Sequence, residues 1–143
     1  MTKKTEQQAK AFSLDDLDAT QKDAFEFEYI TDEGQSTGIF LKVLGGQSST
    51  VTKEVSRLVN ERRKAQAIRA ANSASRGRKE VSFDRIEDDV EFGQRLAAVR
   101  LVGWRGIAED FTPENGLKLC QRNRDISAQI TEQSDKLSNF MKL

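Results

Sequence analysis

The stretch Leu96–Phe111, LAAVRLVGWRGIAEDF, holds the densest apolar run of the chain and its single tryptophan. Six of the seven residues from 96 to 102 are apolar, and only Arg100 interrupts them. A helix that is apolar on all sides is normally surrounded by protein, and this run is far shorter than the roughly 20 apolar residues that span a bilayer. We therefore predict a helix over about 83–102 with a buried end, which Gly103 terminates as glycine does just beyond a helix.

Trp104 follows where we expect the chain to turn. It either fills the core, with its indole N–H on an acceptor, or anchors a partner, since tryptophan is enriched at binding hot spots. Arg105 beside it is either an ion-pair partner within the domain or a contact to another protein. We favour the core for Trp104 and keep both residues as candidates for partner binding.

The composition fits one soluble domain without catalytic machinery. The chain has 143 residues, 36% hydrophobic and 32% charged, with a formal net charge of zero. A single cysteine, Cys120, excludes an internal disulfide, and the absence of histidine excludes a Cys/His zinc site and a histidine-based triad. We expect no enzyme, no cofactor, no bound metal and no membrane association. The polar N-terminus contains no apolar signal segment, which predicts a reducing, cytoplasmic compartment.

The charges are unevenly distributed along the chain. Residues 14–34 carry eight acids and one lysine, whereas residues 57–80 carry eight basic residues and two acids. Such asymmetry usually marks interaction surfaces. The basic segment 57–79 could neutralise phosphates, but no aromatic side chains are interleaved for base stacking. A solvated helix face or a docking surface for an acidic partner, including Arg62 and Arg63, is favoured over nucleic-acid binding.

Alternation and turn residues predict an antiparallel hairpin over 25–44. Phe25, Phe27 and Tyr29 alternate with glutamates, which is the pattern of a half-buried strand. After a glycine-containing connection, Gly38–Leu44 is a second strand with apolar residues on both faces. A lone hairpin is marginal in water, so it must pack on helices or on another chain. Edge-to-edge pairing, and with it a homo-oligomer, therefore stays open.

Helical spacing predicts the remaining elements. We expect helices over about 49–72, 83–102, 113–121 and 126–141. Ser82 is placed to cap the second of these, Thr112 with Pro113 to begin the third, and Asp125 to cap the last. The last helix carries an apolar stripe, formed by Ile126, Ile130, Leu137, Phe140 and Met141.

Together these patterns predict an α+β fold, mainly helical with three to four helices and an N-terminal antiparallel hairpin. Residues 1–24 form a flexible acidic tail and residues 25–143 a single domain. Within the tail, the sequence SLDDLDA at Ser13–Ala19 predicts one or two capped helical turns. This segment is either an acidic linker, which we favour, or an acidic docking strip.

The order of short sequence motifs along the chain resembles that of a known family. The strand GIFLKVLG precedes a long Arg/Lys/Ala-rich helix, and VGWRGI, TPENGLKL and a final helix ending in SNFMK follow. This order resembles the small tail assembly chaperone-type proteins of long-tailed bacteriophages over roughly 25–141. The strongest matches are Gly103–Gly106, Thr112–Asn115 and Asn139–Phe140.

The resemblance implies a non-enzymatic factor in the host bacterial cytoplasm. Proteins of this type bind the tape measure protein, keep it soluble, help to recruit tail tube subunits and are generally absent from the virion. Trp104, Arg105, Asn139 and Phe140 are carried over by motif position. A structural tail or neck component is the alternative in the same setting. The candidate partner-binding residues are Trp104, Arg105, Ile126, Ile130, Leu137, Phe140, Arg62 and Arg63.

Overall fold

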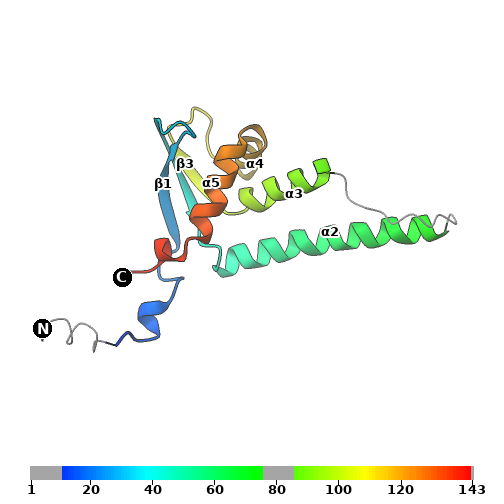
Figure 1. Ribbon diagram of the computed structural model, residues 1–143, viewed down its shortest axis with the longest axis horizontal. Coiled ribbons are helices and arrows are strands. Elements are labelled where there is room, and N and C mark those ends of the chain that lie inside the picture. The colour runs from blue at the N-terminus through cyan, green and yellow to red at the C-terminus, as the bar shows by residue number, and fades with distance from the viewer. Residues whose placement is uncertain (1–10, 76–85, 143) are drawn as a thin grey trace, which may run out of the picture.

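The computed structural model describes residues 11–75 and 86–142, which form a small α+β body and a projecting helix (Figure 1). The elements follow in the order η1 (Asp15–Leu17), β1 (Ala24–Ile30), β2 (Ser36–Leu44), α2 (Ser49–Ser75), α3 (Ile86–Ala98), β3 (Leu101–Arg105), α4 (Pro113–Arg122), α5 (Arg124–Asp135) and η2 (Leu137–Phe140). The chain is mainly helical with an N-terminal antiparallel hairpin, so the predicted α+β class is confirmed.

The predicted hairpin is confirmed as β1 and β2, which pair antiparallel with Phe27 opposite Leu41 and Phe25 opposite Val43. Leu41 and Val43 are fully buried on one face of the sheet, while Lys42 between them is exposed on the other. The alternation of side chains along each strand therefore decides which face the helices cover.

A third strand replaces the end of the predicted helix 83–102. α3 ends at Ala98, and Leu101–Arg105 forms β3, which pairs antiparallel with β2. Gly103 does not terminate a helix but lies opposite Lys42 within the sheet. The prediction was wrong because a short apolar run suits a buried helix and a buried strand equally, and pairing with a distant strand decides between them. The predicted cap Ser82 lies outside the described residues.

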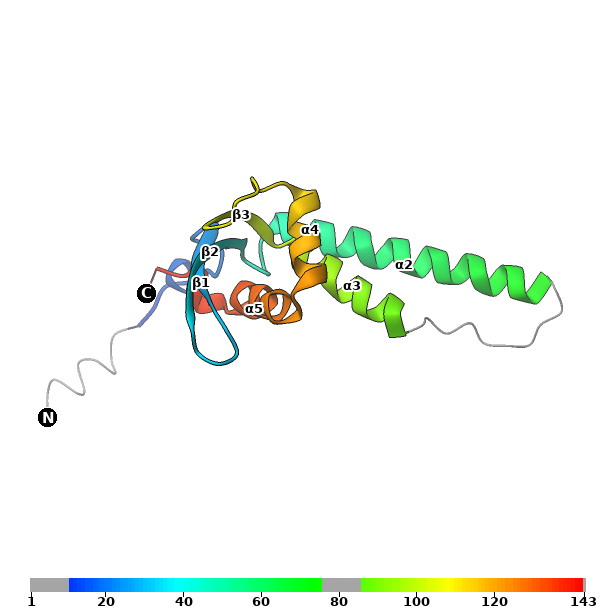
Figure 2. The same ribbon diagram turned by 90° about the horizontal axis from the view of Figure 1, so that it is seen from above.

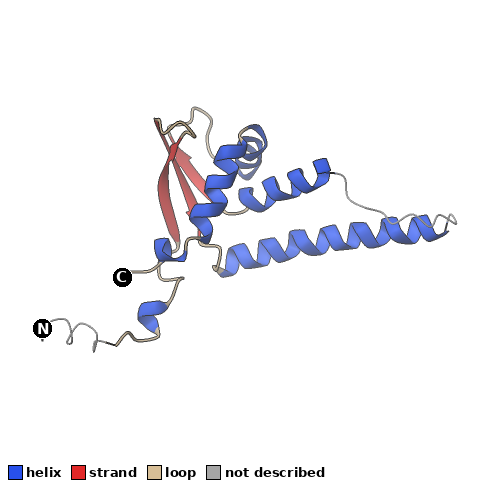
Figure 3. Ribbon diagram, in the orientation of Figure 1, coloured by secondary structure: helices blue, strands red, loops and turns tan. Residues whose placement is uncertain are grey.

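The helices α3, α4 and α5 cover one face of the sheet (Figure 3). The buried cluster between them draws on every element of the body and consists of Tyr29, Leu41, Val43, Ala97, Leu101, Cys120, Ile126, Ile130 and Phe140. α4 begins as predicted, because the Thr112 hydroxyl accepts a hydrogen bond from the Asn115 N–H at 3.0 Å and Pro113 is the first helical residue.

The predicted helix 126–141 is two elements. α5 ends at Asp135, Lys136 has extended backbone angles, and η2 follows. Asn123 caps α5 by accepting from the Ile126 N–H at 3.0 Å. Asp125 is not the cap; its carboxylate instead accepts a hydrogen bond from the Tyr29 hydroxyl at 3.1 Å. The break at Lys136 allows Phe140 to turn into the core, where its ring meets Phe25 edge-on.

The C-terminal segment is bound to the chain just before β1. The Lys22 N–H donates to the Phe140 carbonyl at 3.0 Å, and the Lys142 N–H donates to Oε1 of Gln21 at 2.6 Å. Residues 11–23 of the predicted tail are described and contain η1, as the sequence SLDDLDA predicts. Residues 1–10 of the tail lie outside the described part.

Candidate interaction site

The long helix α2 is the largest element that the body leaves uncovered. It has 27 residues, which corresponds to about 40 Å of helix, and it extends well beyond the body in both views (Figures 1 and 2). The helix prediction for 49–72 is thus confirmed. Only Val51 and Leu58 are buried, and no residue of the described helix beyond Leu58 is. α2 therefore begins with a part that packs on the body, residues 49–58, and continues with a part that contains no buried residue, residues 59–75. We call residues 59–75 the arm.

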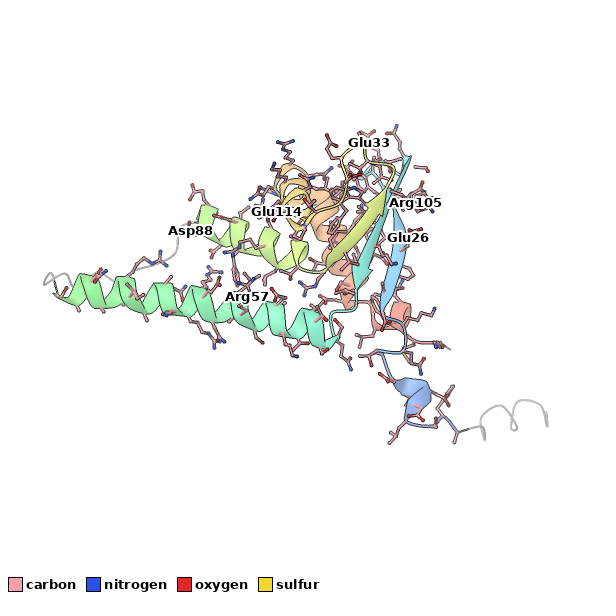
Figure 4. All side chains as sticks on the ribbon, turned by 180° about the vertical axis from the view of Figure 1, so that it is seen from behind. Glu26, Glu33, Arg57, Asp88, Arg105 and Glu114 are labelled. Atoms are coloured by element: carbon pink, nitrogen blue, oxygen red, sulfur yellow. The ribbon has the colours of Figure 1, made fainter. Side chains whose placement is uncertain are left out.

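Charge and aromatic contacts hold α3 beside this arm. The Arg62 guanidinium lies 4.5 Å from the centre of the Phe92 ring and forms an ion pair with Asp89. Arg95 of α3 approaches Glu61 of α2 at 3.7 Å. Arg62 of α2 thus faces the acidic first turn of α3, the helix that lies beside α2 (Figure 4). Exposed pairs of this kind are worth about 0–1 kcal/mol each, so they orient α3 more than they fix it.

A groove of about 610 Å³ runs between α2 and α3. Its apolar walls come from Leu58, Ala65, Ile68 and Phe92, and charged side chains of both signs form its rim. Ile68 is 53% exposed, which is unusual for an isoleucine beside an apolar groove. We call this the α2–α3 groove; it is the principal candidate site for a partner.

Two arginines of α2, Arg57 and Arg62, form ion pairs with acidic residues. Arg57 binds Glu54 at 2.9 Å and Glu61 at 2.7 Å. Its pKa is raised, chiefly by the hydrogen bond and the charge of Glu54. Arg62 is half-buried against α3, whereas Arg63 is exposed. The part of the basic segment beyond Ser75 lies outside the described residues. Arg57 and Arg62 are thus paired within the chain, so a polyanion would have to compete with Glu54, Glu61 and Asp89 for them.

Trp104 and Arg105 lie on opposite faces of β3. The Trp104 indole N–H donates to the Glu109 carbonyl at 2.8 Å, and its ring meets Phe111 edge-on with 5.1 Å between centroids. Arg105 points to the uncovered face of the sheet, where it stacks 3.8 Å above Phe40 and binds Glu26 at 3.0 Å (Figure 4). Trp104 is half-buried and Arg105 exposed, so each retains surface that a partner could contact.

The apolar stripe of the last predicted helix lies mainly inside the body. Ile126, Ile130 and Phe140 are buried in the core, and of the residues singled out on this stripe only Leu137 is exposed, at 42%. The stripe is therefore part of the domain's own packing and does not form a continuous docking face.

The described residues include one buried thiol, that of Cys120. Burial raises the pKa of the Cys120 thiol to about 11, although a hydrogen bond with Ser127 opposes this, so the sulfur is protonated at neutral pH. Residues 11–75 and 86–142 contain no group of three or more His, Cys, Asp or Glu side chains arranged to hold a metal ion. In the same residues, every helix is too short or too polar to cross a bilayer.

Two apolar features were missed from the sequence. Ile68 and Phe92 line the α2–α3 groove, and Phe12, Leu14 and Leu17 are exposed around η1. Ile68 had a signal, because it continues the apolar spacing of α2 past the point where the body ends. The sequence also carried a signal for the three residues around η1, because linkers are usually poor in large apolar side chains.

Comparisons with known proteins give no match. No protein-family model matches the chain. Neither the curated proteins nor the solved structures contain a match.

Proposed function

We propose that this protein is a non-enzymatic assembly factor of the phage tail chaperone type. It acts in the host bacterial cytoplasm, binds the helical tape measure protein and helps to recruit tail tube subunits. The sequence motifs around Gly103–Gly106 and Thr112–Asn115, which resemble those of the tail chaperones, suggest that the protein acts in phage tail assembly. The exposed arm of α2 supports the mode of action.

The arm is the single observation that carries the proposal. An isolated helix gains little from propensity alone, and most helices in proteins are stabilised by packing of one face. Within the described residues, α3 is the element that lies beside α2 beyond Leu58. Ile68 there remains more than half exposed. A second helix laid in the α2–α3 groove would bury Ala65, Ile68 and Phe92 and complete a three-helix layer.

The residues that line the α2–α3 groove indicate what kind of partner would fit it. Apolar walls with a rim of both charges fit an amphipathic helix whose apolar residues recur at i, i+4 and i+7. Each wall carries charges of both signs, Glu61 and Arg62 on α2 and Glu91 and Arg95 on α3, which favours a helix with mixed charges along its flanks. Long helical proteins that aggregate when alone have such stripes in many copies.

Co-expression tests the proposal. A tape measure protein from a long-tailed phage, produced together with this chain, should give a several-fold higher soluble yield than when produced alone. Ile68→Asp should abolish the gain, because it places a charge in the groove. Ile86→Asp is the matched control, since Ile86 is an exposed apolar residue that does not line the groove. An unchanged yield with the wild-type chain would reject the proposal.

A structural tail or neck component is the second candidate, supported by the same exposed groove, which could equally hold a permanent neighbour. Mass analysis of purified particles separates the two. A chaperone should be absent from particles, whereas a structural component should be present in fixed copy number.

A further inference from the structure

A second exposed apolar feature lies far from the α2–α3 groove. Phe12, Leu14 and Leu17 are 63%, 89% and 53% exposed, and they surround the single turn η1. Asp15, Asp16 and Asp18 alternate with them. We call residues 12–18 the acidic strip. Three large apolar side chains grouped in water mark a contact surface more often than a linker.

The acidic strip is already shaped for binding. The Ser13 N–H donates to Oδ2 of Asp16 at 3.0 Å, and the Asp16 N–H donates to Oγ of Ser13 at 3.3 Å, which is a reciprocal cap. In a 3₁₀ turn residues three apart are eclipsed, so Leu14 and Leu17 project from the same side. A partner would therefore meet the apolar side chains without the cost of ordering the backbone.

A complementary pocket lies on the other side of the body, between β3 and α4. Its apolar walls are Trp104, Ile107 and Leu119, and its volume is about 240 Å³, which suits one large aliphatic side chain. Lys118 and Arg122 lie one turn apart on the exposed side of α4 and carry two positive charges. Glu109 carries one negative charge, so the charged groups that line the pocket are net positive. We call this the Trp104 pocket.

We propose that the acidic strip of one molecule docks into the Trp104 pocket of a second copy, with Leu14 inserted between Trp104 and Leu119. The strip carries three aspartates and no cation, so its charge matches the pair Lys118 and Arg122. Tryptophan and arginine are the residues that most often dominate such contacts.

The geometry makes this contact intermolecular. η1 lies near the N-terminal end of the described chain, across the body from α4 (Figure 1), and only six residues separate Leu17 from β1. The strip therefore cannot reach the pocket of its own molecule. Because the two surfaces differ, each copy offers one of each, and the contact is head-to-tail, giving rings or open chains. The α2–α3 groove takes no part, so the inference is independent of the proposed function.

The test is the size of the full chain in solution, measured by sedimentation over a hundredfold range of concentration. The wild type should form species that grow beyond a dimer as the concentration rises. Leu14→Asp, which blocks the strip, and the double variant Lys118→Glu/Arg122→Glu, which blocks the pocket, should each weaken association about tenfold or more. Both changes are at exposed positions, so the fold should persist. Ile86→Asp, at an exposed apolar position outside both the strip and the pocket, is the matched control and should associate like the wild type.

Mixing the two blocked variants gives the decisive result. One retains an intact pocket and the other an intact strip, so an equimolar mixture should form a dimer and nothing larger. Asp15→Lys combined with Lys118→Glu in the same chain should restore association that either change alone weakens. A wild type that stays monomeric, or association that survives both blocked variants, as strand-edge pairing would, overturns the proposal.

Discussion

The helices α5 and α2 both carry apolar residues at helical spacing, but the body covers this face in α5 and leaves most of it uncovered in α2. α5 has 12 residues and buries Ile126, Ser127, Ile130 and Ser134. α2 has 27 residues and buries two, both in its first three turns. Apolar periodicity thus identifies the face that will be covered, but not whether the same domain covers it. In this protein the longer helix is the one that its own domain leaves mostly uncovered.

Removing one large side chain from each region should affect the stability of the protein very differently. Phe140→Ala should lower the free energy of unfolding by about 3–5 kcal/mol, because it empties a fully buried site. Ile68→Ala on the arm should change it by less than about 0.5 kcal/mol. Urea titration of both variants measures the difference. A comparable loss for Ile68→Ala would mean that the arm is part of the cooperative core.

The alkaline stability of the body gives a second probe. Burial raises the pKa of Cys120 from 9.0 to about 11, so the folded state keeps the thiol proton that the unfolded chain releases first. The free energy of unfolding is unaffected by this group below about pH 9. It should then fall by on the order of 2 kcal/mol as the pH rises to 11. Cys120→Ala removes the titrating group, so the difference between the two pH profiles isolates it. Parallel profiles would show that the thiol is not buried as described.

The cap of α4 tests a smaller effect in the body. Thr112→Ala should lower the free energy of unfolding by about 1 kcal/mol, because the Asn115 N–H loses its acceptor. Thr52→Ala on the exposed side of α2 is the control and should have no destabilising effect, since alanine is the better helix former. Thermal unfolding compares the pair. Equal losses would contradict the assignment of Thr112 as the cap.

The smallest effect belongs to the ion pair between the helices. Asp89→Asn should cost at most about 1 kcal/mol, and 0.5 M salt should remove the difference from the wild type. Amide exchange along α2 and α3 is the suitable measurement, because only the arm should respond. Glu132→Gln, an exposed acid on α5, is the control. A loss of several kcal/mol would indicate a buried pair and an arm that is fixed, not adaptable.

Local signals were sufficient for much of the fold. The alternation at Phe25–Tyr29, the start of α4 at Thr112 and the long helix from Ser49 were all predicted from neighbouring residues. β3 was not, because its pairing with β2 joins segments about 60 residues apart in the sequence. The break at Lys136 was also missed, since nothing in the local sequence interrupts the helical spacing there.

The candidate site was predicted less well, for a related reason. Arg62 was found from the charge pattern, but Ile126, Ile130 and Phe140 were offered as a docking stripe and lie in the core. The groove needs α2 and α3 side by side, and that arrangement depends on contacts such as Arg62 with Phe92 that no local pattern encodes. Surfaces made by two elements are visible only after the elements are placed.

The attachment of the C-terminus to the chain before β1 has a practical consequence. Lys142 and Gln21 are joined by a hydrogen bond, so two fluorescent labels placed at Thr20 and Lys142 would start close together. Energy transfer between them would report on loss of the body's core and would be blind to bending or melting of the arm. A third label near the end of α2 would follow the arm by itself, so that movement of the arm could be timed separately from unfolding of the body.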